Sequence, residues 1–235
     1  MQRILPAQNP AALSADLAAL FPVGVIAADL GQAAPRELLS APELACVSHC
    51  AHQRIERFAA GRLCARLALE ALGITGFSLL RAPDRQPLWP EGVTGSITHT
   101  AGYAAAVVAR RGALSSLGID SEVVAEVHEG LWPGITAPGE LAQLRALPGA
   151  AGRAHAAVLF AAKEAFYKSQ YPLTGEWLRF DDVVIEIAAA GSGETGRFRV
   201  LPQRPLAVGR ELRAEPAGRY RLHGPFVTAG LALPS

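Results

Sequence analysis

Two acidic residues, Asp120 and Glu122, lie two positions apart in an apolar segment that is typical of a β-strand. Because side chains alternate between the two faces of a strand, we expect both carboxylates to point to the same side. Two convergent carboxylates suit Mg²⁺, which commonly takes one or two protein carboxylates together with waters and substrate phosphates. The pair therefore makes a magnesium site one interpretation, although an isolated pair of this kind is more often an ordinary solvated strand edge.

A helical segment further along the chain carries Glu164 and Lys168, one helical turn apart. An apolar stripe on the same segment should face the core; it comprises Val158, Leu159, Ala162, Ala165 and Phe166. Glu164 and Lys168 lie roughly opposite Phe166, so we expect them to face a cleft or solvent. The alternative is a surface ion pair that contributes only a few tenths of a kcal/mol to helix stability.

The use of lysine favours a functional interpretation of this helix. Of the 22 basic residues, only Lys163 and Lys168 are lysines, and all the others are arginines. Codon bias explains a general preference for arginine, but it does not explain why both lysines lie in one segment. A lysine retained in such a chain indicates a need for a compact ammonium that can give up its proton.

Candidate phosphate ligands occur at the end of another predicted strand, in residues 95–99. Ser96, Thr98 and His99 offer two hydroxyls and an imidazole, although a structural histidine is an equally common alternative. A long helical segment before this strand carries Arg54, Arg57, Arg62 and Arg66. Such arginines usually form a solvated face, but Gly61 beside Arg62 indicates the close approach of another backbone or a ligand.

Cysteine and histidine side chains gather near the start of that segment, at Cys46, His49, Cys50 and His52. No second pair at the spacing of a zinc finger follows them, only Cys64. We therefore expect small residues that pack on a helix, and not a zinc site. An odd number of cysteines also favours reduced thiols in a cytosolic protein.

The composition sets wider limits. Of the 235 residues, 50% are hydrophobic and 18% are charged, which excludes a disordered chain and allows a self-sufficient core. The formal net charge of +1 excludes a general attraction to nucleic acid or anionic membranes, so a polyanion site must be local. The N-terminus lacks a signal-peptide pattern, and no apolar run of about 20 residues could span a bilayer. We expect a soluble, cytoplasmic protein.

The elements that would position these side chains occur in both halves of the chain. Helices are predicted over 11–20, 42–72, 140–147 and 154–170, the last ended by Pro172. Strands are predicted over 23–28, 77–80, 96–98, 103–110, 116–124, 182–187, 197–201, 220–222 and 226–231, and a loop rich in proline and glycine over 130–139. The pattern predicts an α+β protein of two similar lobes, residues 1–115 and 116–235.

Taken in order, four motifs resemble those of the 4'-phosphopantetheinyl transferases, in the long bacterial class that activates siderophore and surfactin synthetases. The segments are residues 58–69 for the first motif, 85–90 with 95–99 for the second, 118–122 for the metal motif and 163–168 for the last. The resemblance extends over about residues 43–182. Ser121 stands where several relatives carry an apolar residue, and Arg85 precedes Pro87 by two positions, where some relatives have a lysine directly before the proline.

The resemblance implies an enzyme that moves the phosphopantetheine arm of coenzyme A onto a serine of an apo acyl- or peptidyl-carrier protein and releases 3',5'-ADP. It implies Mg²⁺, with Mn²⁺ as a substitute, held by Asp120, Glu122 and Glu164. Lys168 would stabilise or protonate the leaving phosphate, and either Glu164 or a metal-bound water would activate the serine. The implied ligands of coenzyme A are Arg54, Arg62, Arg85, Thr98, His99, Lys163 and Lys168.

The same resemblance implies two ferredoxin-like lobes related by pseudo-twofold symmetry, with coenzyme A in the cleft between them and the chain working as a monomer. It does not identify the carrier protein, or whether the pathway makes a siderophore, a polyketide or a nonribosomal peptide. Two other functions are alternatives: a magnesium-dependent phosphohydrolase of small nucleotides, and a non-catalytic module that binds coenzyme A or a carrier protein. The complete set of charged motif positions argues against the module, because a pure binder could lose Glu164 or Lys168.

Overall fold

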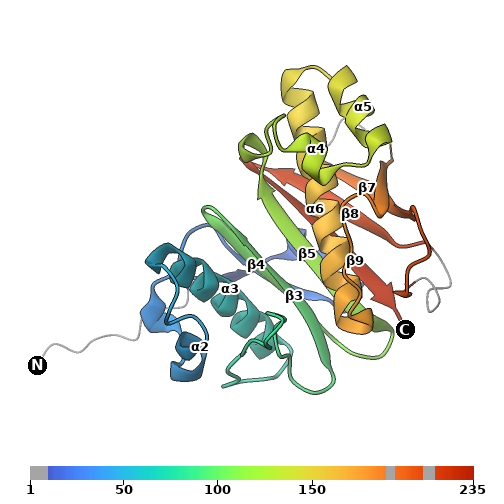
Figure 1. Cartoon of the computed structure of the whole chain (residues 1–235). Coiled ribbons are helices and arrows are strands. Elements are labelled where there is room, and N and C mark those ends of the chain that lie inside the picture. The colour runs from blue at the N-terminus through green and yellow to red at the C-terminus, as the bar shows by residue number, and fades with distance from the viewer. Residues whose placement is uncertain (1–9, 189–193, 209–214) are drawn as a thin grey trace, which may run out of the picture.

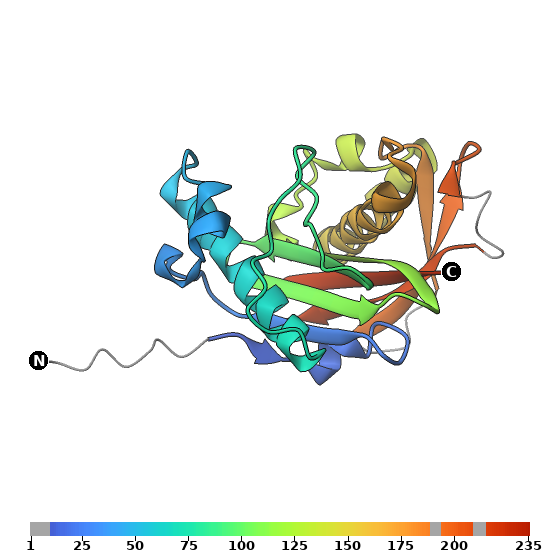
Figure 2. The ribbon, with the colours of Figure 1, turned by 90° about the horizontal axis from the view of Figure 1, so that it is seen from below.

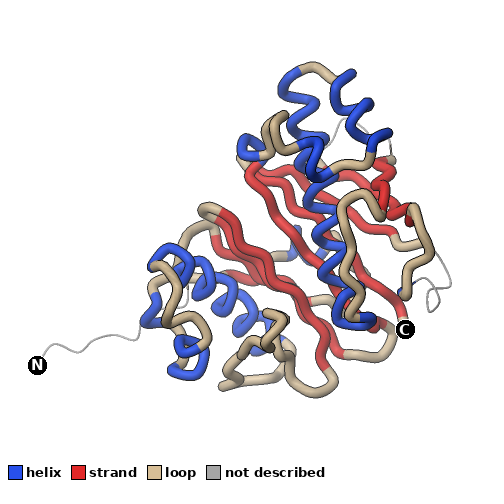
Figure 3. Tube along the Cα trace, in the orientation of Figure 1, coloured by secondary structure: helices blue, strands red, loops and turns tan. Residues whose placement is uncertain are grey.

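The strands of the protein form two antiparallel sheets, each with a long helix packed against it (Figure 1). A computed structural model describes residues 10–188, 194–208 and 215–235. Figure 3 shows the strands of both lobes running close together at the centre, with the helices in front of them. The prediction of an α+β fold is therefore confirmed. No helix in the described ranges is long and apolar enough to cross a membrane.

The first sheet has the strand order β1-β2-β4-β3. Its strands are β1 (Ala12–Leu13), β2 (Ile26–Leu30), β3 (Val93–Thr100) and β4 (Tyr103–Arg110), and its helices are α1 (Ala15–Ala18), α2 (Ala41–Ala45) and α3 (His52–Ala71). Helix α3 lies so close to β3 at Gly61 that a Cβ on this residue would lie only 2.8 Å from Cγ2 of Ile97. Gly61 does mark a close approach, but its neighbour is the Ile97 side chain of β3 and not the backbone or ligand that we expected.

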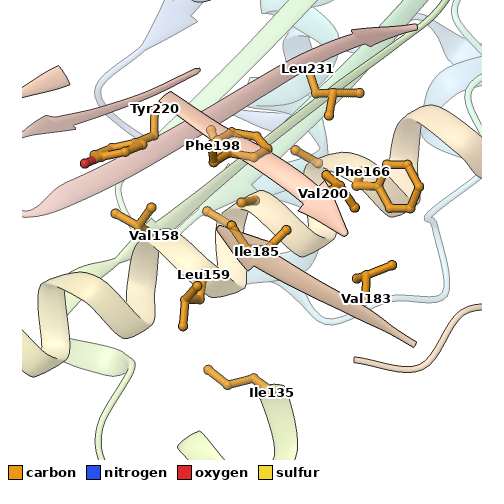
Figure 4. Packing of buried hydrophobic residues seen from close by; sticks show 14 of the residues in the cluster. Ile135, Val158, Leu159, Phe166, Val183, Ile185, Phe198, Val200, Tyr220 and Leu231 are labelled. Carbon is orange, nitrogen blue, oxygen red and sulfur yellow. The ribbon is translucent and has the colours of Figure 1, made fainter. Parts of the chain in front are cut away.

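The second sheet has the strand order β5-β9-β8-β7-β6. Its strands are β5 (Leu114–Val123), β6 (Val183–Ile187), β7 (Thr195–Pro202), β8 (Ala217–His223) and β9 (Phe226–Pro234), and its helices are α4 (Trp132–Ile135), α5 (Pro138–Ala146) and α6 (Gly149–Thr174). Figure 4 shows how Leu159 and Phe166 of α6 pack with Ile185 and Phe198 of the sheet. A Cβ on Gly118 of β5 would lie 1.8 Å from the carbonyl oxygen of Ala165, so only glycine lets α6 approach the strand this closely.

The two sheets meet along β3 and β5, where side-chain hydroxyls accept backbone hydrogen bonds across the junction. The Ser96 hydroxyl accepts from the amide of Ile119 at 3.2 Å, and the Thr98 hydroxyl accepts from the amide of Ser121 at 2.9 Å. Figure 2 shows α3 and α6 on one side of the strands and α1, drawn in deep blue, on the other. On that second side, an apolar cluster that includes Phe21 and Ile119 packs both lobes together.

Several elements differ from those predicted. The segment 130–139 is not a plain loop, because α4 and the start of α5 lie within it, and the indole of Trp132 is buried and donates to the carbonyl oxygen of Val127. Pro172 lies inside the last turn of α6, and the helix ends at Gly175, which has a φ of 65°. The predicted helix over 42–72 is divided into α2 and α3, and the predicted helix over 11–20 into β1 and α1.

The segment 77–80 is not a strand; near it, only an isolated bridge joins Arg81 to Pro87. Its backbone bonds to a side chain instead of a strand, since the amide of Leu79 donates to the buried carboxylate of Glu43 at 3.1 Å.

We propose that the lobes divide at residues 115 and 116, just after β5 begins at Leu114. The last strand of the first sheet ends before this point, at Arg110.

Candidate active site

A cavity of about 1000 Å³ lies between an arginine-rich wall and one face of α6. The basic wall comes from α3 and from the chain before β3, and its arginines include Arg54, Arg57, Arg62, Arg81 and Arg85. The opposite wall is formed by Glu164, Tyr167, Lys168 and Tyr171 of α6. The fold thus sets one acidic and one basic side chain against a cluster of guanidinium groups, an arrangement suited to a ligand with several phosphates.

Lys168 joins the cavity to the strand that carries the predicted metal ligands. Its Nζ donates to Oδ1 of Asp120 at 2.6 Å. The same ammonium donates to the carbonyl oxygens of Ile119 at 3.2 Å and Ile97 at 3.4 Å. The ammonium of Lys168 therefore links α6 to β5 and β3 at the junction of the two sheets.

Asp120 and Glu122 both lie on the α6 side of β5, as the two-residue spacing predicts, but they are set back from the cavity. Burial raises the pKa of Glu122, and the charge of Asp120 raises it further. Burial and Asp120 likewise raise the pKa of Glu164, while Lys168 lowers it. The charge of each predicted metal ligand therefore acts on the others, so the three carboxylates lie near one another where a negative charge is costly.

The donor chemistry of this neighbourhood fits a divalent cation. Oδ2 of Asp120 is buried and has no hydrogen-bond partner in the described part of the chain. An orphaned carboxylate oxygen beside two further carboxylates provides the oxygen ligands that Mg²⁺ prefers. However, no three histidine, cysteine, aspartate or glutamate side chains of the described ranges stand together as a ready-made metal site. The three carboxylates are therefore near one another, and their side chains would have to move closer to bind one cation.

Thr98 and His99, predicted together as phosphate ligands, have different surroundings. The Thr98 side chain is buried, and its hydroxyl donates to Oδ1 of Asp120 at 3.2 Å. Thr98 therefore orients Asp120 and does not line the cavity. His99 does line the cavity, where burial and then the charge of Lys168 lower the pKa of its imidazole.

The three predicted arginine ligands all line the cavity. Arg62 is the most constrained, because its Nε donates to the carbonyl oxygen of Leu79 at 2.7 Å and its guanidinium lies 4.1 Å from the centre of the Phe58 ring. Burial lowers the pKa of Arg62 to about 10, so the side chain stays charged at neutral pH. Arg85 has a φ of 75°, an unusual backbone conformation for a residue with a side chain.

Sequence reasoning missed several residues of the cavity. Arg57 was grouped with a solvated face, although it lies three positions after Arg54 and four before Gly61, on one side of a helix. Trp89 also lines the cavity, and it packs so closely on Gly95 that a Cβ there would lie 2.7 Å from the indole. For Arg81 and the two tyrosines of α6, the sequence carries no comparable signal.

Lys163 does not join this group, which corrects its predicted role as a ligand of coenzyme A. Its Nζ donates to Oε2 of Glu140 at 2.5 Å and to the carbonyl oxygen of Phe180 at 2.7 Å. Both charged side chains are 2% exposed. The other carboxylate oxygen of Glu140 accepts from the amide of Ile185 at 2.8 Å. Lys163 therefore holds α5, α6 and β6 together through a buried ion pair.

Replacing Lys163 with methionine should lower the free energy of unfolding by about 3–5 kcal/mol, because Glu140 would remain buried without its cation. Urea denaturation measures the change. The matched control is Arg199→Met, which breaks an exposed ion pair with Glu186 and should cost less than about 1 kcal/mol. Equal losses in the two variants would contradict the assigned role of Lys163.

Two family models match the chain. The 4'-phosphopantetheinyl transferase N-terminal domain matches residues 42–109, and the 4'-phosphopantetheinyl transferase superfamily matches residues 116–217. The chain is 37% identical over 205 residues to 4'-phosphopantetheinyl transferase PptT of Mycobacterium tuberculosis, covering 85% of this chain and 88% of the relative. It is 38% identical over 179 residues to 4'-phosphopantetheinyl transferase Svp of Streptomyces mobaraensis (76% and 72% covered). It is also 34% identical over 136 residues to enterobactin synthase component D of Escherichia coli strain K12 (57% and 63% covered).

Proposed function

The chain belongs to the 4'-phosphopantetheinyl transferase superfamily, and we propose which of its residues bind coenzyme A, bind the metal and transfer protons in the reaction. The enzyme activates carrier proteins by transferring the phosphopantetheine arm of coenzyme A. The transfer joins a serine hydroxyl to the phosphate of the arm and releases 3',5'-ADP. The relatives that support this activity are named as transferases, so neither the phosphohydrolase nor the binding module is retained.

The proposed site for coenzyme A is the cavity between the arginine wall and α6. The observation that carries this proposal is the set of five arginines, Arg54, Arg57, Arg62, Arg81 and Arg85, that line one wall. Guanidinium groups bind phosphate oxygens through paired charge-assisted hydrogen bonds, and coenzyme A carries three phosphates. His99 lies on the same cavity and can add a hydrogen bond. Because both walls come from one chain, the monomer is the proposed working unit.

We assign the divalent cation to Asp120, Glu122 and Glu164. When bound there, Mg²⁺ would neutralise negative charge on the pyrophosphate oxygens of coenzyme A. The buried, unpartnered Oδ2 of Asp120 supports this assignment, since an acceptor without a partner is costly unless a ligand satisfies it. Thr98 and Lys168 fix the other oxygen of Asp120, which leaves Oδ2 free to bind.

Glu164 and Lys168 are the proposed acid–base pair. Both line the cavity, one helical turn apart. Burial and Asp120 raise the pKa of Glu164, which makes it a stronger base than an ordinary carboxylate for the proton of the acceptor serine. Lys168 is an ammonium whose three hydrogens are directed at oxygens of Ile97, Ile119 and Asp120. Its charge can stabilise the leaving phosphate, and to protonate that phosphate it would give up one of these hydrogen bonds.

Replacing His99 or Arg54 with alanine should weaken coenzyme A binding by roughly 1–3 kcal/mol each, the range for hydrogen bonds to charged groups. Isothermal titration with coenzyme A measures this loss. Repeating it with dephospho-coenzyme A identifies the contact, because a variant whose defect vanishes with that analogue had bound the 3'-phosphate. Arg36→Ala is the matched control, since Arg36 is exposed and outside the cavity. Unchanged affinity in both site variants would remove these residues from the site.

A further inference from the structure

A buried chain of side-chain hydrogen bonds lies on the face of β5 opposite the metal carboxylates. It begins at Ser121, the residue between Asp120 and Glu122, whose hydroxyl lies 2.8 Å from the hydroxyl of Thr228 on β9. The same Thr228 oxygen lies 2.8 Å from Nε2 of His223 on β8. The Ser121 and Thr228 side chains are buried, at 2% and 0% exposure. Three strands of the second sheet are therefore joined through polar side chains beneath the proposed metal site.

The far end of this chain is anchored in both lobes. The His223 ring packs edge-on against Tyr103 of β4, with 5.0 Å between ring centres, and lies 5.7 Å from the Phe226 ring. The Tyr103 hydroxyl donates to Oδ2 of Asp29 on β2 at 3.1 Å. Because Tyr103 and Asp29 belong to the first sheet, the position of the imidazole depends on how the two lobes meet.

Ser121 is held from two directions at once. Its hydroxyl is bonded to Thr228 of the second sheet, and its backbone amide donates to the Thr98 hydroxyl of the first sheet. A rotation of β5 about its own axis would break both bonds. The same rotation would swing the flanking carboxylates of Asp120 and Glu122, because neighbouring side chains are fixed to one backbone.

The Thr228 hydroxyl has one hydrogen, while Ser121, His223 and the Tyr103 hydroxyl all lie within its reach, so it can donate to only one of them. If Thr228 donates to Nε2 of His223, the Ser121 hydroxyl donates to Thr228. If Nε2 of His223 carries the hydrogen, it donates to Thr228, which then donates to Ser121. Removing the threonine hydroxyl breaks the chain in either case and leaves both neighbours without this partner.

We propose that Thr228 and His223 are positioning residues that hold β5 in the orientation in which Asp120 and Glu122 bind the divalent cation. The proposal rests on the proposed metal site. Partners outside the ligand shell commonly change metal affinity or activity by about 10–100-fold when they are lost. Ser121, which departs from the apolar residue of several relatives, thereby acquires a specific role.

The test compares Thr228→Val, which keeps the shape but removes the hydroxyl, with Thr228→Ser, which keeps the hydroxyl. Binding of Mn²⁺ alone, followed by electron paramagnetic resonance, should be weakened about 10-fold or more in Thr228→Val and restored in Thr228→Ser. Raising the Mg²⁺ concentration should recover most of the turnover lost by Thr228→Val. A loss of thermal stability without any change in Mn²⁺ affinity would overturn the proposal.

Further variants separate this proposal from the metal site itself. If Asp120→Ala binds Mn²⁺ as well as the wild type does, the proposed metal site is wrong. If Asp120→Ala loses Mn²⁺ binding while Thr228→Val keeps it, only the positioning role is wrong.

His223→Phe keeps the ring contacts without the nitrogen and should weaken Mn²⁺ binding as Thr228→Val does. Should Thr228→Val fail to fold, Ser121→Ala decides the matter against Ser115→Ala. Ser115 lies on the same strand with its hydroxyl bonded to the exposed Ser235, so its variant should bind Mn²⁺ normally, and equal binding by Ser121→Ala would refute the proposal.

Discussion

Asp120→Ala should reduce kcat for phosphopantetheine transfer by a factor on the order of 10³ or more. The carboxylate contributes an oxygen to the proposed metal site, and metal stabilisation of phosphoryl charge is worth several kcal/mol, at about 1.4 kcal/mol for each tenfold change in rate. The variant loses the hydrogen bonds that Oδ1 accepts from Thr98 and Lys168, but removing one of three neighbouring carboxylates also relieves repulsion, so we expect it to fold with reduced stability. Turnover with an apo carrier protein, measured beside circular dichroism, tests both parts.

Glu122→Ala should show a loss similar to that of Asp120→Ala, and a chelator should stop the wild-type enzyme. Mn²⁺ should restore the chelated enzyme, since it also prefers oxygen ligands. Glu126→Ala is the matched control, because Glu126 is an exposed carboxylate just beyond β5 and should be dispensable. Near wild-type activity in Asp120→Ala or Glu122→Ala would show that the metal is bound elsewhere.

Lys168→Arg should lose about 10²-fold in kcat, nearly as much as Lys168→Ala. A single Nζ donates to three oxygens, on Ile97, Ile119 and Asp120, and a planar guanidinium cannot direct its hydrogens to the same three points. An arginine would also retain its proton, whereas general acid catalysis contributes typically 10²–10⁴-fold. Single-turnover rates at saturating coenzyme A separate this loss from weaker binding.

A Lys168→Arg enzyme with most of its activity would contradict this account of the ammonium. The retained lysine would then reflect composition alone. The assignment to the transferase family would stand, because it rests on relatives that match most of the chain.

The two lysines illustrate how far the sequence predicts the site. They are the two lysines in a chain whose other basic residues are arginines, and each forms an ion pair with a carboxylate in the structure. Lys168 reaches the cavity, whereas Lys163, about 140° away around the helix, is buried in an ion pair with Glu140. Composition identified the residues, but only the packing of α5 against α6 determines which lysine lines the cavity.

The fold was most predictable where one pattern dominated. The strand predicted over 103–110 is β4, with the same bounds, because its apolar side chains are buried on both faces of the sheet. The prediction failed where a tertiary contact overrides local preference, as at Leu79, whose amide donates to Glu43, and also at Pro172, which lies inside α6 instead of ending the helix. The hydrogen bonds of Thr98 to Asp120 and Ser121 could not be predicted either, because they cross the junction between two sheets.

Asp120, Glu122 and Glu164 are the proposed ligands of the divalent cation on which transfer depends. Intact-mass spectrometry of an apo carrier protein, incubated with coenzyme A and this enzyme, tests this proposal most directly. With Mg²⁺, the wild-type enzyme should add one phosphopantetheine group to the carrier protein, and it should add none with a chelator present. Asp120→Ala should leave the carrier protein unmodified in both samples. Full modification by Asp120→Ala, or by the wild type in chelator, would contradict the proposal.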